Sequence, residues 1–145
     1  MNINWYPGHM AKTRRLLIEN LKLVDIVIEL LDARVPNSSQ NPDFNGIFNN
    51  KKRVKVFNKY DLSDVVVSAS WKSYYEEKGY PCIFINSMTG SGFKNLLREI
   101  EDQLKEKFER DARRGLLRRP IRAMVVGIPN VGKSTFINRL TGRSS

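Results

Sequence analysis

Two residue types are almost absent from this sequence of 145 residues: it contains one cysteine, Cys82, and one histidine, His9. A single cysteine excludes a disulfide scaffold and a cysteine-based zinc site, and it is typical of a reducing compartment. No apolar run approaches the ~20 residues of a membrane-spanning helix. The first nine residues also lack the charged and then apolar profile of a signal peptide. We therefore expect a soluble, cytoplasmic protein with no membrane partner.

Acidic residues are few, since 15 Asp and Glu stand against 25 Lys and Arg and leave a net charge of +10. This excess favours a polyanionic partner, either nucleic acid or a phosphorylated ligand. Half of it lies within 105–122, where eight basic residues stand against three acids. We interpret 105–122 as a basic helix end and linker. A contact with RNA phosphates and a solvated helix face both remain open for it.

Short apolar runs alternate with helical patterns along the chain, and hydrophobic residues make up 41% of it, enough for one modest core. Unbroken runs predict strands buried on both faces of a parallel sheet, at 24–31, 53–57, 82–86 and 121–126. Apolar residues at three- and four-residue steps predict helices, at about 10–22, 71–78 and 93–108. This alternation predicts an α/β fold with a Rossmann-like parallel sheet, whose ligands bind at the carboxyl ends of the strands.

The strongest motif is G-x-x-x-x-G-K-S at 127–134, between a predicted strand and a predicted helix. Its glycines let backbone N–H groups turn toward phosphate oxygens, Lys133 reaches the terminal phosphates, and the Ser134 hydroxyl ligates magnesium. The helix N-terminus adds a partial positive charge. The expected phosphate-binding residues are Asn130, Val131, Gly132, Lys133, Ser134 and Thr135. The motif indicates a P-loop domain and leaves ATP and GTP open.

Two further motifs follow predicted strands and favour guanine. Residues 58–61 have the N-K-x-D pattern, in which Asp61 accepts hydrogen bonds from guanine N1–H and the exocyclic amine. Asn58 would hold the loop, and the Lys59 stem would cover the ring. Ser87 and Met88 begin a loop at the position where GTPases support the base through backbone N–H groups. An ordinary polar turn is the alternative for each motif, and their joint occurrence with the phosphate loop favours the base-reading interpretation.

The order of the motifs differs from that in ordinary small GTPases, where the phosphate loop comes first and the guanine motif comes late. Here the guanine motif comes first and the phosphate loop last, which resembles the circularly permuted GTPases. W-Y-P-G-H-M at 5–10 and D-A-R-V-P at 32–36 extend the likeness. Over residues 4–143 the chain resembles the ribosome biogenesis GTPase A family of large-subunit assembly factors, least so over 62–81.

The resemblance implies a GTPase that uses Mg²⁺ and binds the precursor of the large ribosomal subunit and its rRNA, with no DNA partner. GTP hydrolysis would act as a switch for binding and release. Lys133 would stabilise charge and Ser134 would ligate magnesium, while Asn130 is a candidate potassium ligand. His9 is a candidate for positioning the attacking water, with a hydrogen bond to a loop as the alternative.

In that family two switch segments and a helical domain follow the phosphate loop, whereas the sequence ends at Ser145. We therefore expect 1–145 to be a truncated GTP-binding domain with an N-terminal helical extension at 1–23. It should hydrolyse GTP slowly or not at all. One alternative is a module that binds guanine nucleotide or RNA without turnover, and another is a small-subunit assembly GTPase of the same permuted class.

The permutation also predicts how the strands are arranged. The strand before the phosphate loop should lie beside the first predicted strand, so that the spatial order is fourth, first, second, third. One edge of the sheet would then stay uncovered, and an uncovered edge favours aggregation. We expect a chain of this kind to be marginally stable or aggregation-prone.

Overall fold

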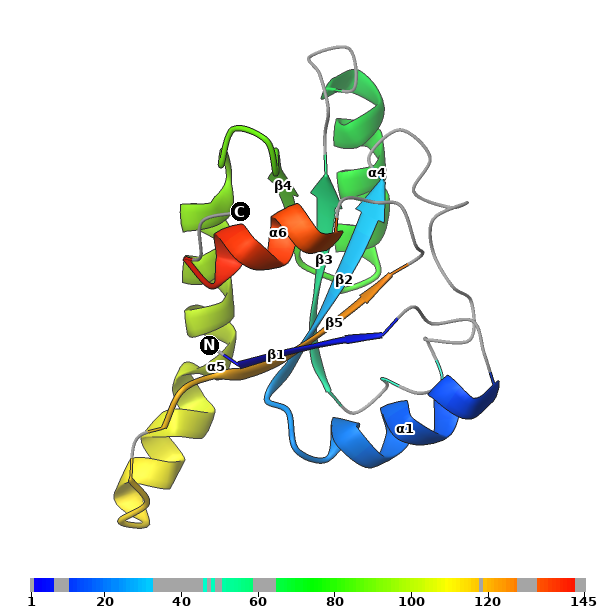
Figure 1. Cartoon of the computed structure of the whole chain (residues 1–145). Coiled ribbons are helices and arrows are strands. Elements are labelled where there is room, and N and C mark those ends of the chain that lie inside the picture. Colours follow the sequence, from blue (N-terminus) through cyan, green and yellow to red (C-terminus); the bar gives the residue numbers. More distant parts are fainter. Residues whose placement is uncertain are drawn as a thin grey trace.

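The computed structural model describes residues 2–6, 11–32, 46, 48, 51–58, 65–117, 119–127 and 133–142. The chain forms one five-stranded sheet, flanked by helices on both faces (Figure 1). The strands are β1 (Asn2–Tyr6), β2 (Ile26–Asp32), β3 (Lys52–Asn58), β4 (Cys82–Ile85) and β5 (Arg122–Gly127). The helices are α1 (Ala11–Leu21), α4 (Val65–Glu77), α5 (Phe93–Arg113) and α6 (Lys133–Leu140). The α/β fold with a parallel sheet is as the sequence predicts.

The strand order is β1-β5-β2-β3-β4, and every pairing is parallel. The predicted order of the four strands, fourth, first, second, third, is therefore confirmed by β5-β2-β3-β4. The last strand of the chain lies inside the sheet and separates β1 from β2. In such a parallel sheet the carboxyl ends of all strands lie along the same side of the sheet, at the ends of the strands.

The strand β1 corrects two expectations. Residues 2–6 were expected to be part of a helical extension, but they form a strand that pairs with β5 along its length, from Asn2 opposite Arg122 to Tyr6 opposite Val126. The edge of β5 that was expected to stay uncovered is thus paired. The physical reason is that the backbone N–H and C=O groups of β5 need partners, and β1 supplies them.

Both faces of the sheet are buried, which explains the unbroken apolar runs of the strands. On one face α5 and α6 cover the sheet, and Leu96, Ile100 and Phe136 pack against residues of β2, β3 and β5. On the other face α1 covers the sheet through Leu17 and α4 through Tyr75. The core therefore consists of two layers, one on each side of the sheet.

One polar pair interrupts this apolar sheet. Glu29 of β2 and Lys55 of β3 lie opposite each other in register, and Lys55 Nζ is 2.7 Å from Glu29 Oε2. Their side chains are 1% and 0% exposed. The Tyr75 ring lies over the ammonium group, with its centroid 4.6 Å from Lys55 Nζ. Each charge of the pair compensates the other in a place that water does not reach.

A second ionic cluster joins three segments at the start of β2. Asp25 is 4% exposed, and its carboxylate accepts hydrogen bonds from Lys107 (2.6 Å), from Arg119 (2.7 and 2.8 Å) and from the backbone N–H of Arg122 (2.9 Å). Burial by itself raises the pKa of the Asp25 carboxyl, but these hydrogen bonds outweigh it and hold the pKa well below its ordinary range. The cluster attaches α5 and the segment before β5 to β2.

We expect Lys55→Met to lower the free energy of unfolding by ~3–5 kcal/mol, because it leaves the Glu29 carboxylate buried and unpaired. Denaturant unfolding followed by circular dichroism measures this loss. The double variant Glu29→Leu/Lys55→Met is the matched control and should recover most of the loss, because neither charge remains. A loss below ~1 kcal/mol in the single variant would contradict the compensating role of the pair.

Asp25 predicts a pH dependence with a defined sign. Its pKa in the unfolded chain is about 3.9 and its folded pKa is lower, so its contribution is complete well above pH 4. That contribution is lost as the pH falls from about 4 toward the folded pKa. We expect Asp25→Asn to cost ~1.5–3 kcal/mol at pH 7 and to flatten the stability curve below pH 4. If the stability of Asp25→Asn fell below pH 4 as steeply as that of the wild type, Asp25 would not be the source of this pH dependence.

Candidate functional site

The predicted motifs lie where neighbouring strands end. Asn58 is the last residue of β3 and is paired in register with Asp32 of β2 and Ile85 of β4. On the other side of β2, Gly127 ends β5 opposite Leu30. Because the strands are parallel, the loops after β3, β4 and β5 leave the sheet at one edge. The structure therefore brings together motifs that are up to 69 residues apart (58 to 127) in the sequence.

Asn58 holds the loop that follows β4. Its side chain is buried, with 1% exposed, and Asn58 Oδ1 accepts a hydrogen bond of 3.2 Å from the Ser87 backbone N–H. The first residue of the N-K-x-D motif thus connects the end of β3 to the loop after β4. Ser87 is itself 3% exposed, and its Oγ has no hydrogen-bond partner within the part of the chain that the structure describes.

The loop after β4 is a tight turn organised by Asn86. Asn86 Oδ1 accepts hydrogen bonds from the backbone N–H groups of Met88 (2.9 Å) and Thr89 (3.2 Å). The Met88 side chain is 71% exposed, so Met88 contributes to the loop through its backbone. Gly92 ends the turn at φ 87°, where an added Cβ would lie 2.1 Å from the Phe84 carbonyl oxygen. Only glycine fits there, directly before α5.

The phosphate-loop motif has the structural context that its chemistry needs. The buried strand β5 ends at its first glycine, and α6 begins at Lys133. Lys133 and Ser134 therefore occupy the first turn of a helix, where the helix dipole and free backbone N–H groups favour an anion. A magnesium ion bound to a nucleotide needs few protein ligands besides the phosphate oxygens, and one hydroxyl in this first turn suits that need. Thr135 is half-buried in the same turn.

Several predicted residues lie outside the described part of the chain. These are His9, Lys59, Asp61, Asn130, Val131 and Gly132. Lys133 and Ser134 are described as helical, without their side chains. Among the described residues, no group of three or more His, Cys, Asp or Glu side chains is arranged to hold a metal ion.

The structure adds two residues that the sequence did not single out, Asn86 and Arg139. Asn86 had a local signal, because an asparagine after a strand favours a turn closed by its own side chain. Arg139 of α6 had no local signal in the sequence. Its guanidinium donates to the backbone carbonyls of Ser87 and Met88, which lie 52 and 51 residues away along the chain.

The lone cysteine is not a reactive group of this site. Cys82 opens β4 and is 3% exposed. Burial raises the pKa of its thiol to about 12, so the thiol stays protonated and is a poor nucleophile at neutral pH. It belongs to the core under α4.

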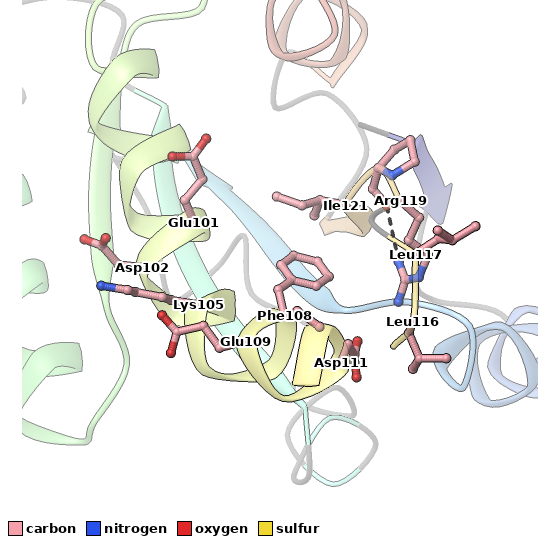
Figure 2. A pocket seen from close by; sticks show the side chains of 12 residues that line it. Glu101, Asp102, Lys105, Phe108, Glu109, Asp111, Leu116, Leu117, Arg119 and Ile121 are labelled. Carbon is pink, nitrogen blue, oxygen red and sulfur yellow. Dashed lines mark hydrogen bonds between the residues drawn. The ribbon is translucent and has the colours of Figure 1, made fainter. Parts of the chain in front are cut away.

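Two basic residues of the stretch 105–122 are used inside the fold. Lys107 and Arg119 turn toward Asp25. A groove of about 1030 Å³ lies between the second half of α5 and residues 116–121 (Figure 2). Four acids and several apolar side chains line it, including Glu101, Asp102, Glu109, Asp111, Phe108, Leu116, Leu117 and Ile121. A contact of the other basic residues of 105–122 with RNA phosphates stays a prediction.

No helix within the described ranges is long and apolar enough to cross a membrane.

Comparison with known proteins agrees with the site. The family described as 50S ribosome-binding GTPase matches residues 122–145, which include β5 and α6. Ribosome biogenesis GTPase A of Bacillus licheniformis is 50% identical over 144 residues, 99% of this chain and 51% of that protein. The Thermotoga maritima protein of the same name is 33% identical over 143 residues, 97% of this chain and 47% of that protein. Along almost its whole length, this chain is similar to the ribosome biogenesis GTPase A family.

Similarity extends beyond the bacterial proteins. Mitochondrial ribosome-associated GTPase 1 of Mus musculus is 38% identical over 137 residues, 94% of this chain and 41% of that protein. The chain thus spans about half the length, or less, of the curated relatives it matches.

We expect Asn58→Ala to lower the free energy of unfolding by ~1–2 kcal/mol, because the buried Ser87 N–H loses its acceptor. Amide hydrogen exchange at Ser87 should become faster, which mass spectrometry or NMR measures. Asn58→Asp keeps an acceptor oxygen at that place and is the control. Unchanged Ser87 exchange in the alanine variant would show that Asn58 does not hold the loop.

Proposed function

We propose that these residues form the guanine-nucleotide site of a GTPase that assists assembly of the large ribosomal subunit. The observation that carries the proposal is the meeting of β3, β4 and β5 at one edge, with Asn58 bonded to the Ser87 loop and α6 beginning at Lys133. The names of the relatives, ribosome biogenesis GTPase A and mitochondrial ribosome-associated GTPase 1, support the cellular role.

In this proposal the base and the phosphates are held by separate loops. Asn58, Lys59 and Asp61 read the base, and the loop at Ser87 and Met88 supports it. Residues 130–135 cradle the phosphates through their backbone N–H groups. Lys133 stabilises the charge that develops on the phosphates, and Ser134 ligates Mg²⁺.

Hydrolysis would serve as a switch between binding and release of the subunit precursor and its rRNA. His9 is proposed to position the attacking water, and Asn130 to ligate a potassium ion. We propose that the 145 residues by themselves turn over GTP slowly. Phosphate release with and without K⁺ tests the potassium assignment.

The guanine assignment predicts a change of base preference in Asp61→Asn. An amide cannot accept hydrogen bonds from both N1–H and the exocyclic amine. GDP affinity should therefore fall about 10- to 100-fold, which corresponds to the loss of hydrogen bonds to a charged group. Affinity for xanthosine diphosphate should rise, because its second oxygen accepts from the amide N–H₂.

Competition of GDP, ADP and xanthosine diphosphate against a fluorescent GDP, with Mg²⁺ and K⁺ present, measures this preference. Glu76→Gln is the matched control, since it also removes one carboxylate, in α4. The proposal fails if the wild type binds ADP as well as GDP, or if Asp61→Asn keeps the wild-type preference.

A further inference from the structure

Arg139 joins the helix of the phosphate site to the loop of the base site. Its Nε donates a hydrogen bond to the Ser87 carbonyl oxygen and its Nη2 donates one to the Met88 carbonyl oxygen. These are adjacent carbonyls, held by two donors of one planar guanidinium group. A fork of this kind fixes direction as well as distance, which a lysine ammonium does not.

Because a peptide bond is planar, holding a carbonyl also sets the direction of the next N–H. The Ser87 carbonyl shares its peptide unit with the Met88 N–H, and the Met88 carbonyl shares its unit with the Thr89 N–H. Both N–H groups converge on a single acceptor, Asn86 Oδ1. Arg139 therefore holds the carbonyl side of two peptide units whose N–H groups are aimed together at one oxygen.

The Arg139 guanidinium lies close to the backbone of Gly90, although the Arg139 side chain is exposed overall. Gly90 has φ 85°, and an added Cβ would lie 2.7 Å from Arg139 Nη1. The position of α6 itself has other support, since Phe136 is 0% exposed and its ring centroid lies 5.6 Å from that of Phe93 in α5. Removal of the guanidinium should thus release the loop without displacing the helix.

We propose that Arg139 is a positioning residue for guanine selectivity, which rests on the proposed function. It acts by orienting the N–H groups of Met88 and Thr89, which donate to Asn86 Oδ1 in this structure. An acceptor oxygen at position 6 of a purine would take the place of Asn86 Oδ1. An amino group at that position is a donor and finds no acceptor in these N–H groups. Arg139 thus affects base selectivity by orienting the loop, without contacting the base.

The test compares nucleotides that differ at position 6 of the base. GDP and 2,6-diaminopurine nucleoside diphosphate share the 2-amino group, the ribose and the phosphates, so the ratio of their affinities reports recognition of position 6. Competition against fluorescent GDP is measured in the complete natural polypeptide that contains these residues, as wild type, Arg139→Ala and Arg139→Lys. Arg98→Ala is the matched control, because Arg98 is an exposed arginine of α5 and its loss changes the charge equally.

We expect Arg139→Ala to lower the GDP affinity and the affinity ratio by about tenfold, with little change for the diaminopurine nucleotide. Arg139→Lys should lie between this variant and the wild type, and Arg98→Ala should match the wild type. Amide exchange at Met88 and Thr89 should be faster in Arg139→Ala alone. If that variant does not fold, the smaller fall in the ratio expected of Arg139→Lys carries the test.

Two outcomes would overturn the proposal. An unchanged ratio would show that position 6 is read without Arg139, and an equal loss for both nucleotides would show that Arg139 supports the site as a whole. Failure of the proposed function is distinguishable, because it appears in the wild type as equal affinity for GDP and ADP before any variant is compared.

Discussion

The arrangement of the sheet depends on how Asp25 fastens the start of β5 to the start of β2. The Asp25 backbone N–H donates to the Arg122 carbonyl oxygen at 2.8 Å, and the Arg122 N–H donates to the Asp25 carboxylate at 2.9 Å. Arg119 and Lys107 complete the hydrogen bonds of that carboxylate. Closing this contact across 97 residues costs chain entropy, which a buried, charge-assisted network helps to offset.

The pairing of β2 with β5 starts next to Asp25 and continues to the candidate site at the carboxyl ends of the two strands. Because β5 lies between β1 and β2, its carboxyl end delivers the phosphate loop to the same edge as the loops after β3 and β4. The described part of the candidate site comes from Asn58 and residues 86–91 on one side and from Gly127 and residues 133–142 on the other. Asn58 connects the end of β3 to the loop after β4, and Arg139 connects α6 to that same loop.

The net charge of the chain does not show which of its basic residues are free on the surface. Lys55 is buried opposite Glu29, and Lys107 and Arg119 neutralise Asp25. Around the groove of Figure 2, acids of α5 lie beside Lys105 and the exposed leucines 116 and 117. Part of the positive charge that suggested a polyanionic partner thus has a structural role inside the fold.

Local patterns in the sequence by themselves determined the fold class, the four predicted strands, the place of the phosphate-loop motif between β5 and α6, and the permuted motif order, because each rests on short-range patterns of residue types. Tertiary structure alone decided the rest. The segment Asn2–Tyr6 is a strand because β5 has a free edge to pair with, which five residues cannot reveal. Asp25, Asn58 and Arg139 gain their partners from segments 29 to 97 residues away. Only the folded sheet brings such groups within hydrogen-bond distance, so no local pattern records them.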